Sequence, residues 1–166
     1  APVADPKSVS ANEDTAVVVT LSGSDSDVPV QTLTYAVATP PTSGVVTLVG
    51  NQATYSPNAN FTGADSFTYT VSDGVTASVP ATVSITVDPV NDAPTITLTG
   101  ANPISLVVGD TYNELGATAS DIEDGNLSGS VVITGALSTS TVGIYMLTYT
   151  VTDSGALSAS TTRTIN

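Results

Sequence analysis

Oxygen-bearing side chains that could bind a metal gather in short, loop-like segments of this sequence. The segment Asp88-Pro-Val-Asn-Asp-Ala-Pro94 carries three of them, and Asp121-Ile-Glu-Asp-Gly125 carries three more. Calcium takes about six to eight oxygens from carboxylates, amides and backbone carbonyls. Because most of the acidic residues lie among Gly, Pro, Asn and Ser, they are expected in loops, where such oxygens can converge. Calcium binding is the chemistry that these residues favour.

Composition argues against most other chemistry. The chain has no cysteine and no histidine, which removes thiolate sites, the usual general base and the commonest ligand of transition metals. Fifteen acidic residues face two basic ones, Lys7 and Arg163, giving a formal net charge of −13, so nucleic acid is not an expected partner. No apolar run reaches the roughly 18 residues of a membrane helix, so no membrane insertion is expected. We predict that the chain is not an enzyme.

Alternating residues predict the strands that position these loops. In the segment 65–73, Phe67, Tyr69 and Val71 alternate with Ser and Thr, as in a half-buried strand. A second alternating run, 79–87, follows Gly74 and completes a predicted hairpin, with Pro80 at an edge or a bulge.

The same strand pattern occurs twice, which predicts two homologous domains. Tyr69-Thr-Val-Ser-Asp73 and Tyr149-Thr-Val-Thr-Asp153 are one motif, with Gly63 and Gly143 also in register. Short strands separated by turn signals favour antiparallel sandwiches, so the fold class is all-β. We predict a first domain over 1–88, an acidic connector over 89–94 that two prolines restrict, and a second domain over 95–166.

These residues resemble known domain families. Residues 3–88 are similar to cadherin-like repeats of bacterial surface and secreted proteins, through Asn12-Glu-Asp-Thr15, Phe61-Thr-Gly-Ala-Asp65 and the connector. Residues 95–166 resemble a shorter bacterial immunoglobulin-like (Ig-like) type, through Leu115-Gly-Ala-Thr-Ala-Ser-Asp121 and Val142-Gly-Ile-Tyr145. Repeats-in-toxin adhesins carry such domains. The resemblance implies two tandem immunoglobulin/cadherin-like antiparallel β-sandwiches and an extracellular, secreted or cell-surface location.

The cadherin resemblance also implies a set of metal ligands. In cadherins, calcium lies between successive domains, and matching that pattern residue by residue implies one or two inter-domain calcium ions here. The implied ligands are Glu13, Asp65, Asp88, Asn91, Asp92, Asp121, Glu123 and Asp153. Weaker candidates are Asp124, and Asp25, Asp27 and Asp73, which would form a half-site at the N-terminal end of the first domain.

Several of these residues have structural alternatives. Asp65 could cap backbone groups or be solvated instead of binding metal, and Asp124 and Asn126 could simply form a turn. Glu114 carries no motif and is expected to be solvated, as is Asp110.

The two repeats each have a tyrosine at the same position of the motif. Tyr69 and Tyr149 are expected to be core residues whose hydroxyls bond to nearby backbone, as in the tyrosine corner of sandwich domains.

The sequence leaves more than one function open. A calcium-stiffened spacer or adhesion module of a larger bacterial protein, monomeric and contacting neighbouring repeats of its own chain, fits best. The alternative is an accessory module of a secreted enzyme that binds a polysaccharide or a cell-surface protein, although the chain has no Trp to form a platform. A hydrolase with paired carboxylates fits least, because the carboxylates cluster in loops at predicted domain ends.

Overall fold

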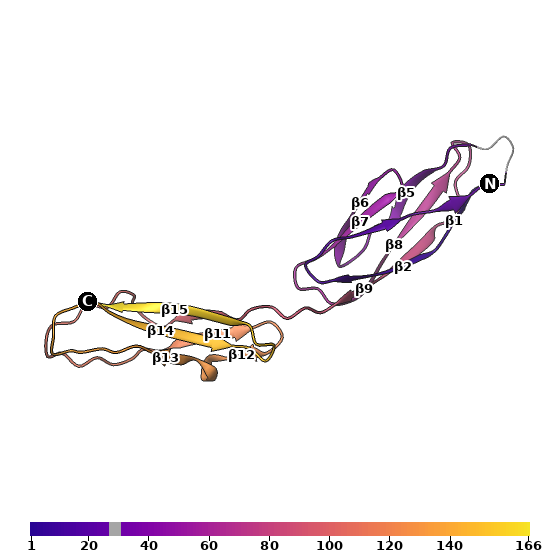
Figure 1. The fold of residues 1–166 in the computed structure, drawn as a ribbon. Helices are drawn as coiled ribbons and strands as arrows, with labels where there is room; N and C mark the ends of the chain where they lie inside the picture. The colour runs from indigo at the N-terminus through magenta and orange to yellow at the C-terminus, as the bar shows by residue number, and fades with distance from the viewer. Residues whose placement is uncertain (27–30) are drawn as a thin grey trace. The chain divides into compact units, whose positions relative to one another are not determined.

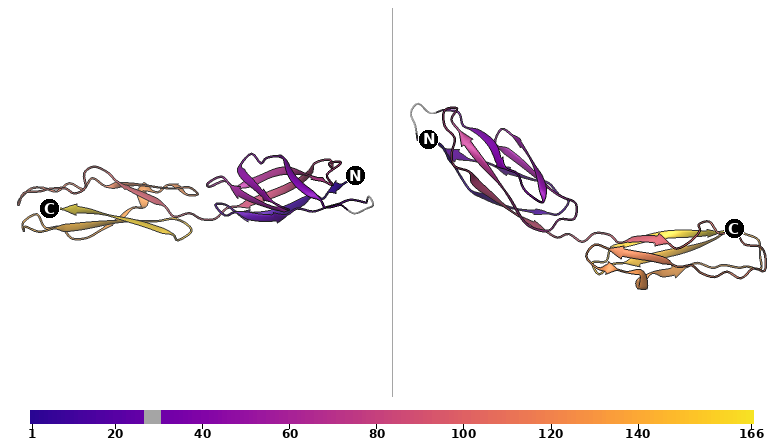
Figure 2. Two further views of the ribbon diagram at one scale, coloured as in Figure 1. Left: turned by 90° about the horizontal axis from the view of Figure 1, so that it is seen from above. Right: turned by 180° about the vertical axis from the view of Figure 1, so that it is seen from behind.

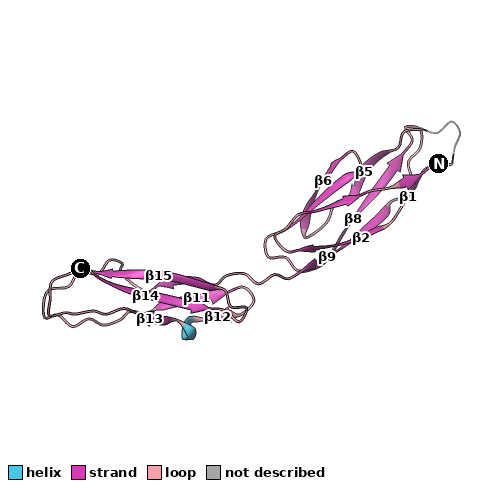
Figure 3. Ribbon diagram, in the orientation of Figure 1, coloured by secondary structure: helices cyan, strands magenta, loops and turns pink. Residues whose placement is uncertain are grey.

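The computed structural model describes residues 1–26 and 31–166, which divide into two compact units, Ala1–Val90 and Asn91–Asn166 (Figure 1). Strands make up nearly all of the regular structure, and the one helix in the described ranges is the short 3₁₀ turn η1, Ser128–Ser130 (Figure 3). The predicted all-β class is confirmed. Asp27, a predicted residue of the N-terminal half-site, lies outside the described residues.

Unit 1 is built from two main sheets and one short strand pair. The four-stranded sheet has the order β2-β9-β8-β5, the three-stranded sheet has the order β3-β7-β6, and β1 pairs with β4. The strands are β1 (Val3–Ala4), β2 (Lys7–Asn12), β3 (Val17–Thr20), β4 (Gly23–Ser24), β5 (Thr34–Thr39), β6 (Gly44–Val49), β7 (Gln52–Pro57), β8 (Gly63–Ser72) and β9 (Ala81–Asp88). The pairing of β2 with β9 is parallel, whereas the sequence predicts antiparallel sheets.

The alternation in β8 and β9 produces the core of unit 1. Phe67, Tyr69 and Val71 are buried, and the predicted hairpin pairs Phe67 with Val83 in antiparallel register. Residues of the second sheet, among them Tyr55, complete the same apolar cluster. Pro80 precedes β9, which begins at Ala81, so the proline removes no hydrogen bond from the ladder.

Unit 2 contains two three-stranded sheets, ordered β10-β11-β12 and β13-β14-β15 (Figure 2). The strands are β10 (Thr95–Leu98), β11 (Ala117–Asp121), β12 (Gly125–Asn126), β13 (Val132–Thr134), β14 (Tyr145–Thr152) and β15 (Ser158–Ile165). Long irregular segments connect them, and the apolar cluster of the described residues has three buried members, Leu147, Tyr149 and Ile165. A core this small leaves unit 2 dependent on its polar contacts.

A buried arginine organises the interior of unit 2. Arg163 is 0% exposed and donates to Oε1 of Glu114 at 3.0 Å and to the carbonyl oxygens of Thr99 and Gly116. Its guanidinium also lies 5.4 Å from the ring centroid of Tyr149. The arginine therefore ties the irregular segment before β11 to the strand β15.

Two expectations for this region are wrong. Glu114 is not simply solvated, because it accepts hydrogen bonds from Tyr112, Tyr149, the amide of Gly116 and Arg163. Burial opposes ionisation of Glu114, but these donors outweigh it and lower the pKa of the carboxyl below its usual value. The Tyr149 hydroxyl donates to this carboxylate, whereas a tyrosine corner would use a backbone carbonyl. The Tyr69 hydroxyl does bond to backbone, at Asp5 and Ser22.

Candidate functional site

The predicted ligands that belong to unit 2 lie at one end of that unit. Asp121 ends β11, Asp153 follows β14 directly, and Asn91 and Asp92 precede β10. Since β10 and β11 are antiparallel, with Thr95 opposite Ser120, the start of one strand lies beside the end of the other. The topology thus places the connector residues next to the loop 121–125.

Hydrogen bonds join these residues into one network. The Asn91 amide donates to Oδ2 of Asp153 at 3.0 Å, and the backbone amide of Asp92 donates to Oε2 of Glu123 at 3.3 Å. Asp124 accepts from the amide and the hydroxyl of Ser154 at 2.6 and 2.8 Å, which lowers the pKa of Asp124. The structure therefore brings together Asn91, Asp92, Asp121, Glu123, Asp124 and Asp153.

Asp121 has an oxygen that this network does not use. Its Oδ1 accepts from the amides of Glu123 and Asp124, at 3.0 and 2.9 Å, whereas Oδ2 is buried without a hydrogen-bond partner among the described residues. The residue is only 9% exposed. Buried polar atoms nearly always have a partner, and leaving one unpaired is costly. A cation would supply the missing partner.

The carboxylates of this end are nevertheless held apart by their present hydrogen bonds. In the described ranges, no group of three acidic side chains lies close enough together to hold a metal ion on its own. Calcium binding would require the oxygens of these side chains to move closer together.

Glu13 and Asp88 anchor the start of the connector to unit 1. Glu13 is buried, its backbone amide donates to the Asp88 carbonyl at 2.9 Å, and its Oε1 accepts from the amide of Val90 at 2.7 Å. Asp88 is the exposed last residue of β9. The Glu13 side chain therefore has a structural role in unit 1, and the inter-domain ion implied by the cadherin resemblance stays a prediction.

Asp65 lies in β8, and its carboxylate caps backbone groups of unit 1. It accepts from the amides of Thr42, Ser43 and Ser66, from the Thr42 hydroxyl and from the Tyr55 hydroxyl at 2.9 Å. Burial opposes ionisation of Asp65, but the three amides and the Tyr55 hydroxyl outweigh it and lower the pKa. The structure favours the capping alternative for Asp65, because both carboxylate oxygens already have donors.

The N-terminal half-site is described only in part. Asp73 accepts from the amides of Val75 and Thr76, which lowers its pKa and closes the turn between β8 and β9. Asp25 lies 3.4 Å from the amino group of Ala1. The Asp73 carboxylate therefore stabilises a turn.

Sequence reasoning missed two residues at the connector end of unit 2. Ser154 holds Asp124, as above, and Gly155 packs against Asn91 so closely that a Cβ atom would overlap the Asn91 amide. The equivalent loop in the first repeat reads Asp73-Gly74, so the requirement for glycine could have been suspected, but its contact with the connector could not.

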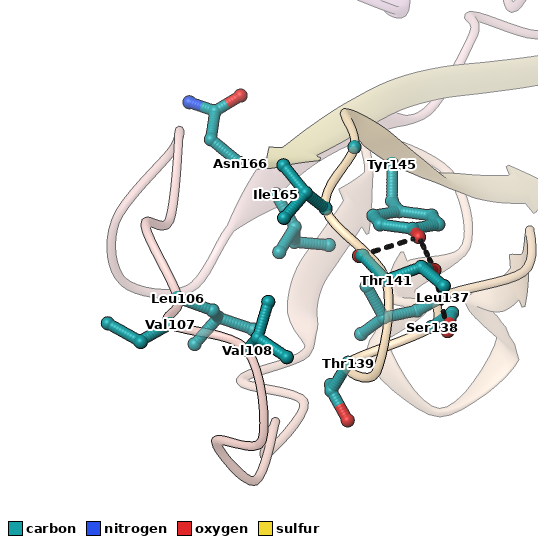
Figure 4. A pocket seen from close by; sticks show the side chains of 12 residues that line it. Leu106, Val107, Val108, Leu137, Ser138, Thr139, Thr141, Tyr145, Ile165 and Asn166 are labelled. Atoms are coloured by element: carbon teal, nitrogen blue, oxygen red, sulfur yellow. Dashed lines mark hydrogen bonds between the residues drawn. The ribbon is translucent and has the colours of Figure 1, made fainter.

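The opposite end of unit 2 has a pocket whose polar side chains are hydroxyls and the amide of Asn166. It is lined by apolar side chains such as Leu106, Val108 and Leu137, and the Tyr145 hydroxyl is bonded to Thr141 beside it (Figure 4). No charged side chain lines it. In the part of the chain that the structure describes, no helix is long and apolar enough to cross a membrane.

Family models match both halves of the chain. Residues 1–86 match the model described as bacterial Ig domain, and residues 96–166 match the model described as bacterial surface protein, Ig-like domain. No curated protein matches the chain.

Solved structures agree with the fold. The chain is similar to protocadherin gamma B2 extracellular cadherin domains 3–6, with 13% identity, a TM-score of 0.53 and coverage of 100% of this chain and 47% of that one. The chain is also similar to human CDH23 EC21–23, with 18% identity, a TM-score of 0.52 and coverage of 99% of this chain and 68% of that one. The lipoprotein BT2262 of Bacteroides thetaiotaomicron is 29% identical over 43% of this chain, with a TM-score of 0.39, and this chain spans 36% of its length. The first two similarities show the cadherin-like fold alone.

Proposed function

We propose that this chain, which belongs to the family of bacterial Ig domains, is a calcium-stiffened spacer of a bacterial cell-surface or secreted protein. Both matched models describe Ig-like domains, and one of them describes domains of bacterial surface proteins. A spacer needs folded units and an ordered connector, and it needs no cleft. The described residues offer acidic loops and a connector whose start is held by the Glu13 carboxylate.

The buried, unpaired Oδ2 of Asp121 is the observation that carries the calcium proposal. Asn91, Asp92, Asp121, Glu123 and Asp153 would hold the ion, all of them at one end of unit 2. Their donors are carboxylate and amide oxygens, which suit calcium, whereas magnesium demands stricter octahedral geometry and is expected to compete poorly. When bound, calcium supplies the positive charge that offsets repulsion between these carboxylates.

A bound calcium ion would stiffen the chain by ordering the connector. Asn91 and Asp92 lie between Pro89 and Pro94, which already restrict the backbone. As ligands, the two residues would be fixed to the loops of unit 2 and lose their remaining freedom. The spacer would then be stiffest in the calcium concentrations found outside cells.

Calorimetric titration of calcium tests this proposal. We expect the wild-type chain to bind calcium in the millimolar range or tighter and to gain thermal stability, because a ligand at a hundredfold excess over Kd stabilises by about 2.7 kcal/mol. Asp121→Asn should weaken binding about tenfold or more, since it removes a charged ligand. Asp110→Asn, an exposed carboxylate outside the network, is the matched control. Absence of binding at about 10 mM, or equal losses in both variants, would rule out this site.

Gly155→Ala provides an independent test through the packing of Asn91. The added methyl group must displace the Asn91 amide and break its 3.0 Å hydrogen bond to Asp153. We expect a loss of about 1 kcal/mol in the stability of unit 2, a shift of the Asn91 side-chain amide signals in NMR spectra and weaker calcium binding. Gly129→Ala, which adds the same methyl group into open space, should change none of them. Unchanged Asn91 signals in the Gly155→Ala variant would contradict the contact.

A further inference from the structure

The three-stranded sheet of unit 1 has no charged residue, although the chain as a whole has a formal net charge of −13. No charged residue occurs between Asp27 and Asp65, a stretch that includes β5, β6 and β7. The remaining strand of the three-stranded sheet, β3, is uncharged as well. The whole sheet β3-β7-β6 is therefore neutral, so no carboxylate of this sheet would repel a second acidic copy.

Strand β6 forms a free edge of this neutral sheet. Among the described strands it pairs only with β7, in an uninterrupted register from Gly44 to Val49. It contains no charged residue, no proline and no bulge, which are the usual features that keep edge strands from pairing with other chains. The other edge of this sheet, β3, is shorter, with four residues against six in β6. The edge strand of the four-stranded sheet, β5, has a register shift and is followed by Pro40 and Pro41.

The side chains of β6 are incompletely covered. Val46 and Leu48 pack against the core cluster but remain only half-buried. A hollow lined in part by Leu33, Tyr35 and Leu48 opens beside them. On the outer face, Val45 is 62% exposed and Val49 is 79% exposed. A strand added along β6 would cover apolar surface on both faces.

We propose that a second copy of this chain pairs with β6 through its own β6, antiparallel, so that two three-stranded sheets join into one. The charge distribution permits this occupant, because two acidic molecules can approach at the neutral edge without opposing carboxylates. The edge is self-complementary: centred on Thr47, antiparallel pairing places Val45 opposite Val49 and Val46 opposite Leu48. Both apolar faces of the strand then continue across the contact.

A contact of this kind is weak for an isolated pair of molecules. One pair of six-residue strands buries less than a standard interface of about 1,600 Å², so a dissociation constant of roughly 0.1 to 1 mM is expected. Copies held side by side on a surface would meet at high effective concentration, where weak contacts add up. The inference goes beyond the spacer proposal and does not need calcium.

Sedimentation velocity over a range of concentrations tests the pairing. We expect the wild-type chain to form dimers as its concentration approaches 1 mM, and the double variant Val45→Glu/Val49→Glu to stay monomeric, because like charges would face each other across the strands. Val18→Glu is the matched control: Val18 is 56% exposed on β3 of the same sheet, so this variant should still dimerise. Circular dichroism and melting curves establish that the variants fold.

Cross-linking provides a second measurement, since the chain has no cysteine of its own. Under mild oxidation, Thr47→Cys should form a disulfide-linked dimer faster than Thr20→Cys, which lies at an exposed position of β3. A monomer at every concentration, a dimer that survives the double substitution, or equal cross-linking of both cysteine variants would overturn the proposal. Loss of the dimer in Val18→Glu would overturn it too, because the sheet face and not the β6 edge would then be the contact.

Discussion

Arg163→Ala is expected to destabilise unit 2 by about 2 to 3 kcal/mol, because it removes a fully buried donor although water can partly solvate the Glu114 carboxylate that stays behind. The variant leaves Glu114 without its cation and leaves the carbonyls of Thr99 and Gly116 without a donor. Because the apolar core of unit 2 is small, this loss is a large share of the stability available to a domain of this size. Hydrogen exchange of peptides from β14 and β15 should show unit 2 opening, while peptides from β8 in unit 1 stay protected.

Substituting both Glu114 and Arg163 tests how much of the loss comes from leaving one charge without its partner. In Glu114→Leu/Arg163→Met both charges are replaced by apolar groups, so stability should recover in part. The carbonyls of Thr99 and Gly116 and the hydroxyl of Tyr149 still lack their partners, so it should stay below wild type. Glu114→Leu alone should be nearly as damaging as Arg163→Ala, because it leaves the arginine buried and unpaired. If Arg163→Ala changes stability by less than 1 kcal/mol, the network contributes little and the loop is held by other contacts.

The strands could be predicted from local patterns. Alternation fixes which side chains of β8 and β14 are buried, and the repeated Tyr-Thr-Val motif places them in equivalent positions of two domains. The parallel pairing of β2 with β9 could not be predicted, because Lys7-Ser-Val-Ser-Ala-Asn12 has the same alternation whichever way its neighbour runs.

The role of each carboxylate was harder to predict than its position. Glu114 lies in an irregular segment, and its partner Arg163 is far along the chain, so no local pattern joins them. Asp65 follows the motif of a cadherin ligand, yet its donors, Thr42, Ser43 and Tyr55, come from a loop and a strand that the motif does not include. Sequence shows which oxygens are available for a metal, whereas their hydrogen bonds depend on tertiary neighbours.

Asp65→Ala is expected to destabilise unit 1 by about 3 to 4 kcal/mol. The substitution leaves the amides of Thr42 and Ser43 and the buried hydroxyl of Tyr55 without their acceptor, and each such loss costs about 1 to 3 kcal/mol unless water replaces it. Asp65→Asn should destabilise unit 1 less than Asp65→Ala, but it should not be neutral. One carboxylate oxygen, an acceptor, becomes an NH₂ group, which would face the donors that Asp65 now accepts from. Chemical denaturation monitored through β8 peptides measures both, and the transition of unit 2 provides the internal control.

The stability that the Asp65 carboxylate contributes should depend on pH. Since folding lowers the pKa of Asp65 from 3.8, its contribution is fully present above that value and is lost as pH falls through the lower, folded-state pKa. The stability advantage of wild type over Asp65→Ala should therefore be constant at neutral pH and should shrink below about pH 4. A calcium ligand would behave differently, because chelator would abolish much of the advantage at pH 7. A difference that persists undiminished at pH 2 would show that the carboxylate's charge is not what holds Thr42, Ser43 and Tyr55 in place.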